Sequence, residues 1–258
     1  MRERRGSWSR RRVLGAGLGL GVTLMSPKAH ALGDVSQLDI AELQLGSGTR
    51  SRPNAWVNLL FETMQTTSVE CEPRAVLLAP DDPALFAHPF SVLLVSGALP
   101  ALSDREREQL QRYRMSGGFL LIDDTTGLSS PEVDTSVRRL VAQLFPTRPL
   151  AVLPADHSVY RSFFLLKRPM GRVVSRGVIE GVPQGSMHPL LYFRDDLSGA
   201  LDRDAAGLPV LPCTPGPDRE QRREAVKLGI NLILYALTSN YKQDQAHVRE
   251  LMRAGRLE

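Results

Sequence analysis

The sequence predicts an α/β fold built on a mostly parallel sheet. Short apolar runs such as 90–97 do not alternate between apolar and polar residues, as a strand with one solvent-exposed face would. Such continuous apolar runs are typical of parallel strands that are covered on both faces. Segments with helical spacing separate these runs, and this order predicts right-handed crossover connections. With 258 residues, 42% of them hydrophobic, the chain can bury one substantial core.

In the first half of the chain, strands and helices alternate. Pro53 stands where a first helical turn tolerates proline, and apolar residues follow it at helical spacing, so a helix is expected over 53–66. Ser103 and Glu106 have the spacing of a capping box, which predicts a helix that begins there and stops near Gly117. The strands expected around these helices cover 38–45, 69–79, 90–97 and a run that begins after Gly118.

The second half is less regular. A long helix is expected over 219–238, and its apolar part, 228–237, is too short to span a membrane and is predicted to be buried against the sheet. Segment 202–217 is rich in Pro, Gly and Asp and is expected to be a surface loop, whereas 173–183 is expected to be irregular because glycine interrupts it. The other predicted elements are helices over 133–144 and 159–164 and strands over 150–153 and 190–193. We expect a single α/β domain over 32–240 and a charged C-terminal tail over 241–258, for which a partly helical structure is left open.

The N-terminus has the regions of an export signal in their usual order: a basic region, an apolar region and a cleavage site. Arginines precede an uncharged apolar segment over 13–25, which is too short to span a bilayer as a stable helix. Ala29-His30-Ala31 then supplies small residues where a signal peptidase recognises them, so cleavage is predicted after Ala31 and the mature protein is expected in the periplasm. Residues 9–14 resemble the twin-arginine motif, whose signals export folded proteins. An ordinary secretory signal is the alternative.

Removing this segment changes the charge balance. Of the 32 basic and 28 acidic side chains, seven basic and one acidic lie in residues 1–31, which leaves 25 basic and 27 acidic in the mature chain. This balance argues against nucleic acid as a partner. No transmembrane span is expected in the mature chain. Cys71 and Cys213 would enter a compartment that permits disulfides, and their spacing leaves open whether they pair.

The stretch 117–127 is the best candidate for a functional site. A glycine pair leads into a short apolar run that ends in Asp123 and Asp124, and this is how a buried strand delivers carboxylates to the edge of a sheet. The functional interpretation is that one carboxylate orients a ligand or binds a hard cation. The structural interpretation is that Asp124 caps the turn that follows and that Asp123 accepts hydrogen bonds from backbone N–H groups. We favour the structural interpretation.

Two other groups of polar residues also follow predicted strands. They are Asp156-His157 and Arg194-Asp195-Asp196, and with Asp123 and Asp124 they form the candidate ligand-binding set if the strands bring them to one edge. Within this set, Asp123, Asp124, His157 and Asp195 are the catalytic candidates. Asp156 could instead cap a helix, which we favour. The histidines lack the spacing of zinc ligands and no phosphate-binding loop is present, so neither a metal nor another cofactor is expected.

Several local patterns together resemble one family of exported bacterial domains. The residues that carry the resemblance are Pro73-Arg74, Asp82–Phe86, His88–Phe90, Leu102-Ser103, the glycine pair before Asp123-Asp124, Asp156–Tyr160, Ser162-Phe163, Asp195–Gly199, Leu228–Leu232, Asp244-Gln245 and His247-Val248. They spread over essentially the whole mature chain, which resembles the domain-of-unknown-function family 4159. The resemblance implies a three-layer, flavodoxin-like arrangement with helices on both faces of the sheet, as in class I glutamine amidotransferase-like proteins.

Enzymes of that superfamily carry a cysteine on a sharp strand-to-helix turn, and this chain departs from the pattern. Cys71 lies between Glu70 and Glu72, whose charges would raise the pKa of its thiol, and Cys213 lies in the predicted loop. We therefore expect a non-catalytic module that binds an envelope protein or a small polar ligand through the strand ends and the loop 202–217. The alternative is a hydrolase-like enzyme that uses the strand-end carboxylates and His157, with or without a divalent cation.

Overall fold

The computed structural model describes residues 37–127, 130–185 and 187–253, without the side chains of 239–253. The predicted export signal over 1–31 lies outside the described residues. Within the described part of the chain, no helix combines the length and the apolar character needed to cross a membrane.

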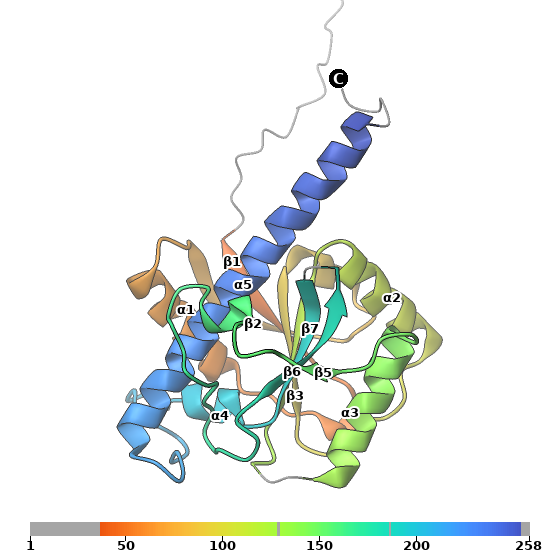
Figure 1. Ribbon diagram of the computed structural model, residues 1–258. Coiled ribbons are helices and arrows are strands. Elements are labelled where there is room, and N and C mark those ends of the chain that lie inside the picture. The colour runs from red at the N-terminus through yellow and green to blue at the C-terminus, as the bar shows by residue number, and fades with distance from the viewer. Residues whose placement is uncertain (1–36, 128–129, 186, 254–258) are drawn as a thin grey trace, which may run out of the picture. The chain divides into compact units, whose positions relative to one another are not determined.

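A seven-stranded sheet forms the centre of the domain, and the predicted α/β fold with a mostly parallel sheet is confirmed (Figure 1). The strands are β1 (Leu38–Leu43), β2 (Cys71–Leu78), β3 (Phe90–Val95), β4 (Phe119–Asp124), β5 (Ala151–Val152), β6 (Ile179–Gln184) and β7 (Met187–Phe193). Their order is β2-β1-β3-β4-β7-β6-β5. The first five strands in this order run parallel, whereas β6 is antiparallel to both of its neighbours.

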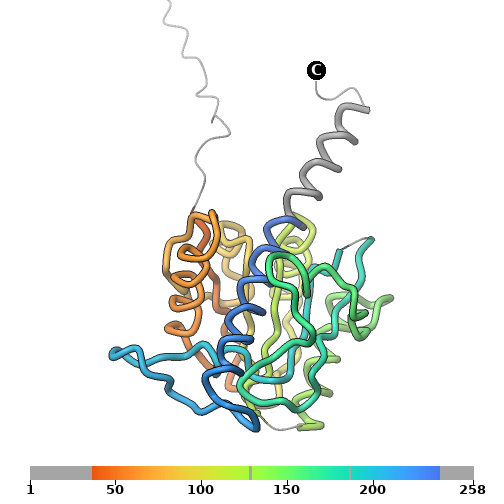
Figure 2. The backbone as a smooth tube through the Cα atoms, turned by 60° about the vertical axis from the view of Figure 1, so that its left-hand side comes forward, coloured from red at the N-terminus to blue at the C-terminus, as the bar shows by residue number. Residues whose placement is uncertain are grey.

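Helices cover both faces of the sheet, so the domain has three layers (Figure 1). On one face lie α1 (Pro53–Thr66), α4 (Leu197–Leu201), α5 (Asp218–Arg253) and the 3₁₀ helix η3 (Ser158–Tyr160). On the other face lie α2 (Asp104–Met115), α3 (Pro131–Leu144) and η2 (Pro83–Ala87), while η1 (Gly46–Gly48) follows β1. Figure 2 shows α5 running beside α1 on the first face. A hydrophobic core fills each side of the sheet.

The helix boundaries follow the local signals of the sequence. Helix α1 begins with Pro53 at its first position and turns Trp56 and Leu59 into the core. At the start of α2, the Ser103 hydroxyl accepts a hydrogen bond from the Glu106 N–H, and the Glu106 carboxylate accepts one from the Ser103 N–H. The predicted capping box is therefore confirmed.

The glycine pair before β4 is required by two different constraints. Gly117 has a φ of +96°, a backbone conformation that residues with a Cβ rarely adopt. Gly118 has an ordinary φ, but a Cβ there would lie 2.3 Å from the ring of Tyr113. Tyr113 is buried and donates a hydrogen bond of 2.7 Å to the His88 carbonyl, so its ring cannot move aside easily.

Two predictions about the second half were wrong in part. Segment 173–183 was expected to be less regular, and 173–178 contains neither helix nor strand, but 179–183 belong to β6, which is stabilised by pairing with β7 in spite of Gly181. Helix α5 was expected to end at residue 238 but continues to Arg253, because the residues of this stretch include strong helix formers and no Gly or Pro. The charged tail over 241–258, for which partial helicity was left open, is thus helical as far as Arg253.

Candidate functional site

The topology brings two of the three predicted groups together. Strand β4 ends with Asp123 and Asp124, and its neighbour in the sheet is β7, which is followed by Arg194, Asp195 and Asp196. Both strands run in the same direction, so these residues lie at one edge of the sheet. We call this group, together with the residues that contact it, the strand-end cluster.

Asp123 holds the start of helix α4. Its two carboxylate oxygens accept hydrogen bonds from the backbone N–H groups of Leu197 and Ser198, each at 2.8 Å. The side chain is fully buried, and burial together with the nearby charge of Asp196 raises the pKa of Asp123 above its usual range. Both oxygens are therefore used inside the protein.

Asp196 joins α4 to α1 and to the segment before β6. Its φ of 54° is unusual for a residue other than glycine. One carboxylate oxygen lies 2.5 Å from a guanidinium nitrogen of Arg52 and 3.0 Å from the N–H of Gly199. The other oxygen accepts a hydrogen bond from Arg172, so one buried carboxylate binds two arginines.

Glu42 extends this cluster to β1, and it was not among the sequence candidates. Its carboxylate accepts a hydrogen bond of 2.8 Å from the backbone N–H of Arg52. Burial raises the pKa of Glu42. The sequence does contain a signal for it. Side chains alternate along a strand, so Glu42 points to the same face of the sheet as Leu38 and Ile40, and it is the one charged residue on that face of β1.

Asp195 organises the segment that precedes β6. Its carboxylate accepts hydrogen bonds from the backbone N–H groups of Ser175 (3.0 Å), Arg176 (2.9 Å) and Gly177 (2.9 Å), and from the Ser175 hydroxyl (2.7 Å). Nearby, a Cβ on Gly171 would lie 1.9 Å from the Asp195 carbonyl oxygen. The segment therefore wraps closely around the end of β7, and Asp195 is also used inside the protein.

Asp124 and Arg194 face the other side of the sheet. Asp124 accepts hydrogen bonds from the Thr126 N–H (3.0 Å) and hydroxyl (2.6 Å), which is the turn predicted by the structural interpretation. Burial raises the pKa of Asp124. Arg194 forms ion pairs with Glu180 (2.5 Å) and Asp134 (3.2 Å). The two adjacent aspartates thus lie in separate environments, as strand geometry requires.

His157 has different neighbours. Its Nδ1 accepts a hydrogen bond from the Val159 N–H (3.2 Å), so His157, and not Asp156 as we favoured, caps η3. Its Nε2 lies 3.1 Å from Nδ1 of His188, the second residue of β7. The Asp156 side chain is 85% exposed. Among the hydrogen bonds of the described residues, none joins His157 or Asp156 to the strand-end cluster.

The histidine pair makes stability depend on pH. Because Nδ1 of His157 accepts a hydrogen bond, its Nε2 carries the proton that points at His188, and adding a second proton breaks this arrangement. Burial and the neighbouring His188 lower the pKa of His157 to about 4. The pKa of His157 in the folded protein thus lies below its unfolded value of about 6.5. The stabilisation that the neutral His157 gives to the folded state is therefore complete above pH 6.5 and is lost as the pH falls through 4.

We therefore expect the free energy of unfolding to fall by about 1–2 kcal/mol between pH 6.5 and pH 4 because of this pair, after allowance for its partial exposure. Denaturant titrations across this range would measure the loss in the wild type. In His157→Asn the side chain can still cap η3 but cannot take up a proton, so this share of the pH dependence should disappear. Equal slopes in the two proteins would contradict the prediction.

The two cysteines do not form an activated nucleophile. Both are buried and unpaired, which answers the question that the spacing left open. Burial raises the pKa of each thiol to about 11, so the thiolate is disfavoured. Among the described residues, no group of three or more His, Cys, Asp or Glu side chains is arranged to hold a metal ion.

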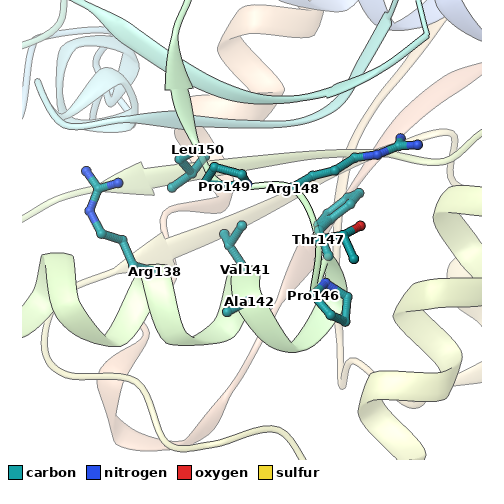
Figure 3. A pocket seen from close by; sticks show the side chains of 9 residues that line it. Arg138, Val141, Ala142, Pro146, Thr147, Arg148, Pro149 and Leu150 are labelled. Atoms are coloured by element: carbon teal, nitrogen blue, oxygen red, sulfur yellow. The ribbon is translucent and has the colours of Figure 1, made fainter.

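Open hollows lie outside the strand-end cluster. One of about 580 Å³ lies between the loop 202–217, the first turns of α5 and Glu62 of α1, with Arg203, Arg219 and Arg223 on its walls. We call it the loop pocket. A second hollow, of about 320 Å³, lies between α3 and the turn over 145–150 (Figure 3). In this view Arg138 and Arg148 extend toward opposite ends of the hollow.

Fold and site together define a class of protein. It is a three-layer α/β protein with a mostly parallel sheet, in which the strand-end carboxylates are buried and hydrogen-bonded within the protein. The chain belongs to the family described as "Domain of unknown function (DUF4159)", whose model matches residues 39–237. The resemblance drawn from the sequence patterns is thereby confirmed. Comparison with curated proteins found no match.

Proposed function

We propose that the protein is an exported binding module that recognises an envelope protein or a small polar ligand without catalysing a reaction. One observation carries the proposal. At the carboxyl ends of the strands, where α/β enzymes place their reacting groups, Asp123, Asp195 and Asp196 are all buried and engaged with backbone N–H groups or arginines. A group that already holds the fold together has no oxygen directed at a substrate.

The hydrolase alternative has less support. It requires His157 to act with Asp123, Asp124 or Asp195, but His157 contacts His188 and Val159. Asp123 and Asp124 lie on opposite faces of the sheet, so they cannot form one pair of catalytic carboxylates. The buried thiols, with their raised pKa values, do not supply a nucleophile in their place.

The loop pocket is the binding surface that we propose, because it includes part of the loop 202–217. Arg219 and Arg223 lie on its walls, and neither forms an ion pair with a described carboxylate. The pocket also lies at the N-terminus of α5, where the helix dipole favours negative charge. Glu62 and Glu220 line it too, so we propose a partner that presents both an acidic group and hydrogen-bond donors. In this proposal, the signal over 1–31 delivers the domain to the periplasm.

The test is capture in native cells. A C-terminally tagged full chain would be expressed in the native bacterium, cross-linked, and recovered from the envelope fraction. We expect a specific binding partner to copurify with the wild type. This partner should be lost with the double variant Arg219→Glu/Arg223→Glu, since both substitutions reverse the charge of a side chain on the pocket wall.

The matched control is Arg105→Glu/Arg107→Glu at the exposed start of α2, which makes the same charge change on the other layer. Capture should persist with this control. Equal capture by both double variants would overturn the proposed surface. The binding-module proposal itself would be overturned if a divalent cation raised the melting temperature of the wild type but not that of Asp195→Ala, because a cation site would then lie at the strand ends.

A further inference from the structure

A third hollow, of about 410 Å³, lies on the opposite layer of the domain from the loop pocket. It lies where α2 and α3 end, beside β6, and it shares the turn residues 145–148 with the hollow of Figure 3. Its polar walls come from Arg114, Arg148, Thr147 and Gln184, and its apolar walls include Leu144 and Phe145. No carboxylate is among its lining residues. We call it the two-arginine hollow.

Arg114 is fixed in place by its neighbours. It donates a hydrogen bond of 2.8 Å to the side-chain oxygen of Gln184, and its guanidinium carbon lies 4.5 Å from the centre of the Phe145 ring. Its Nε is buried and has no hydrogen-bond partner among the described residues. Arg114 is therefore a positioned cation with unused donor capacity.

Arg148 is a second cation on the same wall. The only hydrogen bond that its side chain makes within the described structure, to the Pro183 carbonyl, is long at 3.3 Å. Arg148 is close enough for its charge to lower the pKa of Arg114, after the larger effect of burial. Neither arginine forms an ion pair with a described carboxylate, whereas Arg138 and Arg194 nearby share Glu180. The hollow thus holds two like charges without a counter-charge.

The ends of two helices supply part of the compensation. Helices α2 and α3 end at Met115 and Leu144, and the partial negative charge at a helix C-terminus stabilises a nearby cation. Carbonyls at both ends already accept capping hydrogen bonds, from the N–H groups of Ser116 and Phe145. The partial charge at each helix end can stabilise one arginine nearby, but it does not remove the repulsion between the guanidinium groups of Arg114 and Arg148.

We infer that the two-arginine hollow binds an oxyanion, the phosphate, sulfate or carboxylate group of a small ligand. Two guanidinium groups supply charge-assisted donors suited to such a group, and the Thr147 hydroxyl and the Gln184 amide supply neutral ones. The apolar walls formed by Leu144 and Phe145 can pack against the carbon body of the same ligand. This site is independent of the loop pocket, since it lies on the other layer.

The test is a thermal-shift and calorimetric titration of the purified protein with inorganic phosphate and, separately, with citrate, at ionic strength matched by sodium chloride. We expect one or both anions to raise the melting temperature in a saturable manner. Stabilisation by phosphate alone supports a tetrahedral oxyanion, and stabilisation by citrate alone supports a carboxylate. Binding should weaken by at least about tenfold in Arg148→Gln and in Arg114→Gln.

The control is Arg112→Gln, also in the last turn of α2 but outside the hollow, which should bind the anion as the wild type does. A second readout separates binding from a structural role. Without added anion, Arg148→Gln should melt at the same or a higher temperature than the wild type, because a like-charge contact is removed. A lower melting temperature of Arg148→Gln, no saturable stabilisation by either anion, or equal affinity in wild type and variants would overturn the inference.

Discussion

Replacing Asp196 by alanine is expected to lower the free energy of unfolding by about 3–5 kcal/mol, because it leaves the buried Arg52 and the partly buried Arg172 without their shared counter-charge. Asp196 is the shared partner of Arg52 and Arg172, and it also accepts a hydrogen bond from the Gly199 N–H. The substitution removes all three contacts at once. Arg52 keeps only a 3.1 Å hydrogen bond from its guanidinium to the Ser198 hydroxyl.

Urea or guanidinium titrations of the wild type and Asp196→Ala would measure the loss. The matched control is Asp156→Ala, which removes the same group from a side chain that is 85% exposed and should change stability by less than about 0.5 kcal/mol. The double variant Arg52→Met/Asp196→Ala should lose less than the sum of the two single changes, since it leaves fewer buried charges unpaired. A loss below about 1 kcal/mol in Asp196→Ala would contradict the buried pairing.

The second large effect is expected at Asp123. Asp123→Ala should cost about 2–4 kcal/mol, because the backbone N–H groups of Leu197 and Ser198 lose their acceptor inside the protein. Helix α4 has only five residues and depends on this contact to start. Hydrogen exchange should therefore show faster exchange of these two amides in addition to the global loss of stability.

Asp124→Ala is the natural comparison, because it removes the neighbouring carboxylate of the same strand. Asp124 contacts only the turn residue Thr126 among the hydrogen bonds described, so its loss should cost about 1 kcal/mol. An effect of Asp123→Ala no larger than that of Asp124→Ala would mean that the contact with α4 contributes little. Unchanged exchange at Leu197 and Ser198 would lead to the same conclusion.

The sequence was most informative where signals are local. The capping box at Ser103, Pro53 at the start of α1 and the glycine pair before β4 act within a few residues, and the structure confirms each of them. The strand-end position of the Asp123 and Asp195 carboxylates also followed from pattern alone, since β4 and β7 are neighbours in the sheet.

The contacts that give these carboxylates their roles could not be predicted in the same way. Arg52 and Asp196 are separated by 144 positions, and nothing in the residues around either one identifies the other. Strand β6 was missed for a related reason, because its stability comes from pairing with β7 and not from its own sequence. His157 was grouped with the carboxylates because it follows a predicted strand, but the chain after β5 places it beside His188.

The distance along the chain between Arg52 and Asp196 has a consequence for synthesis. A nascent chain that has not yet reached residue 196 contains β1 and α1, but Arg52 lacks the carboxylate that neutralises it in the folded protein. Helix α5, which covers the same face, is translated later still. This layer of the domain can therefore close only after Asp196 and helix α5 have been synthesised, so β1 and α1 must wait for segments that follow them by more than a hundred residues.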